Sequence, residues 1–229
     1  MVQSFLTRLL VGIACVGMGV TIAGCQGMQA ASPEPTLVVT PTVEASADQS
    51  SIVADVADVH ISMNVPQGWR SQQARYGVLL IEKTGYVHPN SKLSGMQVYV
   101  FVRSVDDFNI PVSSNSNVAW NILDHIVSMP DYIGDASVSG PTGFQWKGHD
   151  GAYYLLNDSH SNLSLVLALV MPQAGRLVAF NVSCPQERAE DIRLALPDLL
   201  MGLTLNDMAI DSSLLAALPD PLDFPVYNR

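Results

Sequence analysis

Two consecutive apolar segments, residues 163–170 and 176–184, constrain the fold of this chain more than any other feature of its sequence. Ser164 is the only polar residue of the first segment, and a turn over residues 171–175 leads into the second. Apolar segments of this length without alternation are typical of strands that are buried on both faces of a sheet. We therefore expect a central sheet with little exposed surface.

A third strand is predicted over residues 96–103, where Val98 and Val100 alternate with Tyr99 and Phe101. Alternate side chains of a strand point to opposite faces, so both faces of this strand are apolar. The pattern favours a central strand that is covered on both sides. The alternative is an apolar groove for a lipid or a partner protein.

Shorter strands complete the predicted sheet. Single strands are expected at residues 58–65, 77–83 and 136–139. The segments 144–146 and 152–156 flank a glycine-bearing loop, which predicts a hairpin.

Two amphipathic helices separate these strands. The first is predicted over residues 118–129, after a capping residue among positions 115–117 and before Pro130. The second is predicted over residues 185–203, where Pro197 is expected to introduce a kink. Helices that are segregated from runs of antiparallel strands predict an α+β fold, a single domain with a central, mainly antiparallel sheet and helices packed on its faces.

The amino-terminal segment does not belong to this domain. An unbroken run of apolar, small and threonine residues fills positions 9–23. It is shorter than the roughly 20 residues that a membrane-spanning helix needs, but it suits the core of a signal peptide. The run leads into the tetrapeptide Ile22-Ala23-Gly24-Cys25, which resembles the lipobox of bacterial lipoproteins, where an aliphatic residue and two small residues precede a cysteine.

In bacterial lipoproteins the cysteine thiol takes a thioether-linked diacylglycerol, and a peptidase then cleaves before that cysteine. The resemblance therefore implies that residues 1–24 are a signal peptide, that Gly24 is the last residue removed and that Cys25 carries the lipid. It also implies a location in the bacterial cell envelope, on the extracytoplasmic face of the plasma or outer membrane. The alternative is an ordinary secretory signal or an uncleaved anchor, with Cys25 incidental.

Two further segments flank the folded domain, which we expect over residues 52–205. Residues 25–51 comprise the lipidated cysteine and a tether rich in Ala, Ser, Pro and Thr, too polar and too often broken by proline to fold alone. Residues 206–229 form an acidic, proline-containing tail with an apolar cluster that includes Leu214 and Leu218. We expect the tail to pack back on the domain, and the alternative is a strap that docks a neighbouring protein.

The segment 65–69, Val-Pro-Gln-Gly-Trp, follows a predicted strand, and its proline and glycine suggest a type I turn. It resembles the proline-glycine-tryptophan turn near the start of PsbP-like domains, a superfamily that includes the extrinsic photosystem protein PsbP and several bacterial lipoproteins. The later order of a helix, a hairpin, two apolar strands and a closing helix extends the resemblance over most of the domain. It implies a PsbP-like sandwich with a binding or assembly role and no shared catalytic residues.

Charge and cysteine content exclude several classes of protein. The formal net charge is -10, whereas a nucleic-acid-binding surface must be basic. Three cysteines are too few for a disulfide framework. Cys15 lies within the signal peptide and Cys25 is the predicted anchor. Cys184 ends an apolar strand, where we expect a small buried hydrophobe and not a reactive thiol.

No catalytic motif is present in the sequence. It contains no G-x-S-x-G elbow and no glycine-rich phosphate loop. Two pairs of possible ligands, His149–Asp150 and Asp158 with His160, border the predicted hairpin and could converge on Zn²⁺ or another divalent ion. Solvated loop residues are the favoured interpretation, so we predict no metal, no cofactor and no enzyme.

The sequence therefore predicts a lipid-anchored cell-envelope protein whose extracytoplasmic domain has a binding or assembly role. Its expected partners are the membrane, through the lipid on Cys25, and another envelope protein, with no nucleic acid. The alternatives are a lipid-tethered hydrolase and a carrier of a small apolar ligand.

Overall fold

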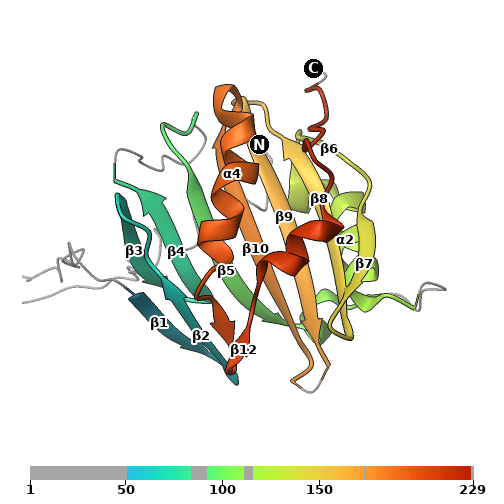
Figure 1. Ribbon diagram of the computed structural model, residues 1–229. Coiled ribbons are helices and arrows are strands. Elements are labelled where there is room, and N and C mark those ends of the chain that lie inside the picture. The colour runs from blue at the N-terminus through green and yellow to red at the C-terminus, as the bar shows by residue number, and fades with distance from the viewer. Residues whose placement is uncertain (1–50, 84–91, 111–115, 173, 228–229) are drawn as a thin grey trace, which may run out of the picture.

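A large antiparallel sheet occupies the middle of the domain, with helical elements on both of its faces (Figure 1). The computed structural model describes residues 51–83, 92–110, 116–172 and 174–227. In spatial order the strands of this sheet are β3 (Trp69–Ala74), β4 (Gly77–Glu82), β5 (Gln97–Ser104), β10 (Arg176–Pro185), β9 (Asn162–Met171), β8 (His149–Asn157) and β6 (Ser137–Val138), and β7 (Thr142–Trp146) also pairs with β8.

The two apolar segments of the sequence form β9 and β10, next to one another in the centre of the sheet. All ten residues of β9 and nine of the ten residues of β10 are buried. Phe180 of β10 lies opposite Val100 of β5 on one side and opposite Leu167 of β9 on the other. The predicted central strands are therefore confirmed, including β5, in which both Val100 and its neighbour Tyr99 are buried.

A second, smaller sheet lies beside the large one. Its order is β1 (Ser51–Val56), β2 (Val59–Asn64), β11 (Thr204–Leu205) and β12 (Met208–Ala209). It joins the beginning of the domain to its end, because Ile61 of β2 pairs with Leu205 of β11. Only β2 was expected from the sequence pattern. All strand pairs among the described residues are antiparallel.

Helical elements cover the two faces of the large sheet separately (Figure 1). Residues of α4 and η3 share the main core with one face, and residues of α2 share a second core with the other face. The helical elements are η1 (Val105–Phe108), α2 (Val118–Ser128), α3 (Pro130–Ile133), η2 (Gln186–Arg188), α4 (Ala189–Leu200) and η3 (Ser212–Ala217). The predicted α+β class, with a mainly antiparallel sheet and helices on its faces, is confirmed.

Two local predictions differ from the structure. The backbone N–H of Trp69 donates to the carbonyl of Pro66 at 3.0 Å, so Gly68 is the third residue of that turn. Gly68 has a φ of 84°, which a type II turn requires at this position, so the predicted type I turn is wrong. The helix predicted over residues 185–203 is shorter, since β10 continues to Pro185 and α4 ends at Leu200.

The predicted hairpin loop is also tighter than the sequence indicated. Trp146 pairs with His149, which leaves Lys147 and Gly148 as a two-residue loop. Both loop residues have positive φ, 48° and 81°, as a type I′ turn requires.

The carboxy-terminal segment packs against the domain, as expected. Leu214 and Leu218 are buried in the main core. The indole N–H of Trp146 donates to the hydroxyl of Ser213 at 2.9 Å, and the side-chain amide of Asn157 donates to the carbonyl of Pro225 at 3.0 Å. The segment is therefore part of the fold at least through η3, and the boundary expected after residue 205 falls inside the β11–β12 hairpin.

Among the described residues, none of the helices is both long enough and apolar enough to span a bilayer. The predicted signal peptide (1–24), with its lipobox residues Ile22, Ala23 and Gly24, lies outside the described residues, as does Cys25. Those assignments stay predictions from the sequence.

Candidate functional site

The helix α4 is held firmly against the main core. Its buried residues recur at the spacing of one helical face and are Ile192, Leu196, Leu199 and Leu200. Glu190 lies in its first turn, where a negative charge is favoured by the helix dipole. The same helix thus presents a fixed opposite face to solvent.

The solvent-facing side of α4 and the residue directly after it carry two of the four exposed large hydrophobic side chains in the described part of the chain. Leu194 is 74% exposed and Met201, directly after the helix, is 65% exposed. Pro197 lies between them and is exposed too. Leu194 and Pro197, three positions apart, share one side of α4, and Met201 is its C-cap residue, so the three residues form a ridge about 10 Å long.

Charged side chains on this side of α4 are acidic. Glu190 and Asp198 are both exposed, one near each end of the ridge. We call Glu190, Leu194, Pro197, Asp198 and Met201 together the α4 ridge.

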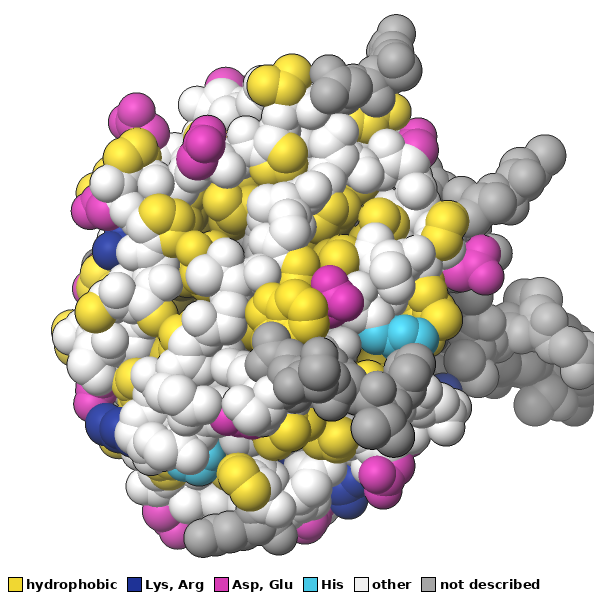
Figure 2. Space-filling view, turned by 90° about the vertical axis from the view of Figure 1, so that its right-hand side faces the viewer, with side chains coloured by type: hydrophobic (Ala, Val, Ile, Leu, Met, Phe, Trp, Pro, Cys, Tyr) yellow, Lys and Arg dark blue, Asp and Glu magenta, His cyan; other side chains and the backbone are white. Residues whose placement is uncertain are grey.

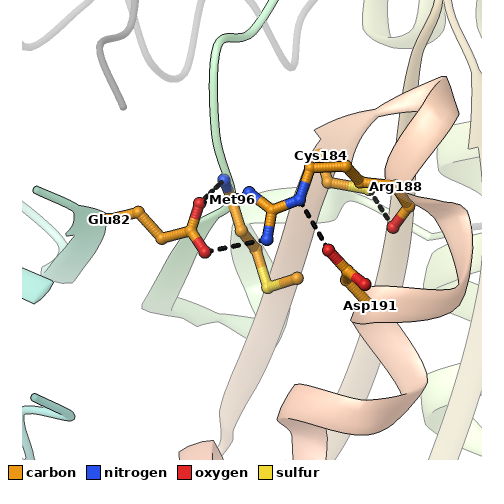
Figure 3. A network of polar contacts seen from close by, with 5 residues as sticks. All are labelled: Glu82, Met96, Cys184, Arg188 and Asp191. Atoms are coloured by element: carbon orange, nitrogen blue, oxygen red, sulfur yellow. Dashed lines mark hydrogen bonds and ion pairs between the residues drawn. The ribbon is translucent and has the colours of Figure 1, made fainter. Parts of the chain in front are cut away.

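The arginine at the start of α4 is turned inward. Arg188 donates to both carboxylate oxygens of Glu82 on β4, from Nη1 to Oε2 at 2.5 Å and from Nη2 to Oε1 at 3.0 Å. Its Nε donates to Asp191 at 2.6 Å (Figure 3). The backbone N–H of Met96 adds a further bond to Glu82 at 2.8 Å, so one carboxylate joins β4, the segment before β5 and α4.

This network shifts the proton affinities of its members. The hydrogen bond from the Arg188 guanidinium holds the pKa of the Glu82 carboxyl below its ordinary value. The same bond raises the pKa of Arg188, which stays charged in any case. Both groups are therefore ionised at neutral pH, and the pair fixes the start of α4.

The one arginine within α4 is engaged as well. Arg193 donates from Nη1 to the backbone carbonyl of Leu215 in η3 at 3.3 Å, and its Nε lies 3.8 Å from the Asp220 carboxylate. Only 22% of its side chain is exposed. Both arginines thus serve intramolecular contacts, and the outer side of α4 carries apolar and acidic groups.

On a different face of the domain, the large apolar side chains are less exposed. Figure 2 shows the side of the domain on which α2 and β7 lie in Figure 1, where hydrophobic side chains reach the surface in the middle and charged ones lie mainly toward the edge. The large apolar residues there, such as Trp120 and Phe144, are only partly exposed. The indole N–H of Trp120 donates to the carbonyl of Pro141 at 2.9 Å, which ties this residue to the domain.

The two predicted ligand pairs do not converge. His149 begins β8, whereas Asp158 and His160 follow its end, and a strand of nine residues separates them by about 27 Å. The hypothesis of a site shared by both pairs is therefore wrong. Among the described residues, no group of three or more His, Cys, Asp or Glu could hold a metal ion.

The acidic member of each pair has a structural role instead. Asp150 accepts the backbone N–H of Val118 at 2.7 Å and so caps the start of α2. Asp158 accepts the backbone N–H groups of His160 and Asn162 at 2.8 and 2.9 Å, which closes the turn between β8 and β9.

Cys184 lies in the core, as the sequence indicated. It is fully buried, and its thiol donates to the carbonyl of Arg188 at 3.3 Å (Figure 3). Burial raises the pKa of the Cys184 thiol to about 12, so the reactive thiolate is scarce at neutral pH.

The sequence pattern had identified the buried face of α4 but not the ridge. Leu194 and Met201 are seven residues apart and fall outside the apolar stripe of the helix. That spacing was a usable signal, because two large apolar residues on the outer side of a helix predict a second apolar face.

Comparison with known proteins gives structural similarity without sequence similarity. No protein-family model matches the chain, and no curated protein matches its sequence. The structure is similar to CyanoP, the cyanobacterial PsbP of Synechocystis sp. PCC 6803, with a TM-score of 0.42 and 11% identity over 68% of this chain and 92% of CyanoP.

Two other solved structures show a comparable similarity. LpqN of Mycobacterium tuberculosis, involved in cell envelope biogenesis, has a TM-score of 0.44 and 12% identity over 68% of this chain and 90% of LpqN. The Ran-binding protein Mog1p of Saccharomyces cerevisiae has a TM-score of 0.41 and 10% identity over 67% and 92% of the two chains. At such values no activity or partner is transferred from these proteins.

Proposed function

We propose that this chain is a lipid-anchored cell-envelope protein that binds or organises another envelope protein and has no catalytic activity of its own. In this proposal Cys25 carries the lipid, and the mature domain stands on the extracytoplasmic face of its membrane. The α4 ridge is the observation that carries the binding role.

The order of segments along the chain supports the anchored arrangement. The lipobox ends at Cys25, and the first strand of the domain begins at Ser51. The 25 residues between them are rich in Ala, Ser, Pro and Thr, and a random coil of that length would span roughly 30 Å. A domain held at that distance reaches neighbouring envelope proteins without resting on the bilayer.

The exposed apolar residues support a surface for a partner. Leu194 on α4 and Met201 directly after it are large, apolar and more than half exposed, while the opposite face of this helix is buried. Clustered apolar side chains that remain exposed in a folded domain mark interaction sites.

The alternatives receive less support from the geometry. Asp150 and Asp158, the acidic members of the predicted ligand pairs, cap a helix and close a turn. The apolar cavity between α4 and the large sheet, lined by residues such as Val98 and Leu196, has a volume of only about 10 Å³. A carrier of a small ligand needs several hundred Å³.

Crosslinking of the intact lipoprotein in its own membrane tests the proposal. The wild-type chain should form reproducible adducts with one or a few envelope proteins. A Cys25→Ser variant, exported through an ordinary signal, should lose the membrane association and most of these adducts. A wild-type chain that forms no adduct with any envelope protein would contradict the binding role.

A further inference from the structure

We propose that the α4 ridge docks a positively charged, apolar-bearing segment of a partner protein of the envelope. This inference rests on the proposed function and adds to it the surface and the chemistry of the partner.

The shape of the ridge fits a short segment of chain. Leu194 and Pro197 lie on one side of α4 and Met201 follows at its end, with Leu194 74% and Met201 65% exposed. A partner segment with apolar side chains at matching intervals would remove this surface from water.

The ridge is also held in place before any partner arrives. The bidentate bond between Arg188 and Glu82 fixes the start of α4, and the contact of Arg193 with Leu215 fixes its flank. A surface that is already ordered loses little conformational entropy on binding.

Charge decides which class of partner fits. Glu190 and Asp198 flank the apolar residues, while Arg188 and Arg193 are used in contacts within the domain. An acidic surface of this kind attracts cationic segments and repels anionic ones. A basic partner segment would therefore pair its charges with these two carboxylates.

The acidic charge of the α4 ridge also disfavours three other occupants. The tether over residues 26–51 has three acidic residues and neither Lys nor Arg. A second copy of the chain has the same net charge of -10. An anionic lipid surface would be repelled as well.

Site-specific photocrosslinking in the full lipoprotein, in its native membrane, tests this assignment. A photoreactive residue at position 194 should give a protein adduct, and the crosslinked peptide, identified by mass spectrometry, should carry net positive charge and apolar side chains. Photoreactive residues at Val53 on β1 and at Val226 near the end of the chain, both exposed, serve as controls.

The possible outcomes distinguish failure of the α4 ridge as the docking surface from failure of the proposed binding role. Adducts at position 53 or 226 but not at position 194 would overturn the ridge and leave the proposed binding role intact. A lipid adduct at position 194, or an acidic partner peptide there, would also overturn the inference. Failure of all three positions to crosslink any protein would overturn both.

A binding assay with a defined probe provides the second test. A synthetic amphipathic peptide of Leu and Lys should bind the wild-type domain, and a matched peptide of Leu and Glu should not. The variant Glu190→Lys with Asp198→Lys should lose affinity by about tenfold or more. The matched control, Asp106→Lys with Asp131→Lys, changes the net charge equally at two exposed positions on η1 and α3. Equal loss of affinity in both variants would show that the peptide senses net charge alone and would contradict the ridge.

Discussion

The guanidinium of Arg188 forms two parallel hydrogen bonds with the carboxylate of Glu82, although 106 residues separate them in the sequence. The pair connects the strand β4 to the start of α4, and only 18% of the Glu82 side chain is exposed. Arginine is suited to this position because its planar fork matches both oxygens of a carboxylate.

Replacing Arg188 is expected to destabilise the fold. The Arg188→Ala variant leaves Glu82 partly buried without its cation, which should lower the free energy of unfolding by about 1–3 kcal/mol. Arg188→Lys keeps the charge but loses the bidentate geometry, so its effect should be smaller. Urea denaturation measures the free energy of unfolding of both variants. Arg193→Ala, which loses a longer hydrogen bond, should lower this free energy less than Arg188→Ala does. Equal stability of Arg188→Ala and wild type would contradict the role of the pair.

The same pair predicts a dependence of stability on pH. The pKa of Glu82 is lowered in the folded protein from its ordinary value of 4.5. Its contribution is therefore complete above about pH 4.5 and is lost as the pH falls toward the lowered folded-state pKa. The difference in unfolding free energy between wild type and Glu82→Gln should be largest near pH 7 and should shrink below pH 4.5. A difference that stays constant from pH 7 to pH 3 would show that ionisation of Glu82 does not matter.

The cap of α2 offers a test of local structure. The side-chain oxygen of Asn117 accepts the backbone N–H of Trp120 at 2.8 Å, and its amide donates to the carbonyls of Phe144 and Gly151, each at 3.0 Å. Asn117→Ala should lower the free energy of unfolding by about 1–2 kcal/mol. The neighbouring Ser116→Ala, at an exposed position before the cap, should change it little. Similar melting temperatures for both variants would contradict the capping role.

The fold of the centre could be predicted from the sequence because its signals are local. The largely apolar segments that form β9 and β10 can be recognised without knowing their partners, and the spacing of buried residues in α2 defines its face. The small sheet could not be predicted in this way. Its pairing of β2 with β11 joins residues about 140 positions apart, and a two-residue strand such as β11 has no periodicity to detect.

The α4 ridge was not predicted from the sequence for a related reason. Periodicity identifies the side of a helix that faces the core, so Leu196 and Leu199 indicate the buried face of α4. Leu194 falls outside this pattern and, taken alone, has no signal that distinguishes it from an ordinary surface residue. The failed convergence of His149 with His160 has another cause. The strand β8 runs without interruption from His149 to Asn157, whereas the sequence pattern predicts only residues 152–156 as strand, so the full distance between its two ends is not apparent from the sequence.

The carboxy-terminal segment should be essential for stability. Leu214 is fully buried in the main core, so Leu214→Ala should lower the free energy of unfolding by about 2–5 kcal/mol. Val226, 75% exposed, is the matched control, and Val226→Ala should leave the melting temperature unchanged. A chain truncated after residue 205 that melts at the wild-type temperature would show that the segment is a dispensable strap.

The central claim is that the mature chain is anchored through a lipid on Cys25. Mass spectrometry of the intact protein, purified from membranes of its native host, measures this directly. The account predicts a chain that begins at Cys25, without residues 1–24, and whose mass exceeds that of the polypeptide by a diacylglycerol group, with or without a further acyl chain. A mature protein with an unmodified Cys25, or one that retains residues 1–24, would contradict it.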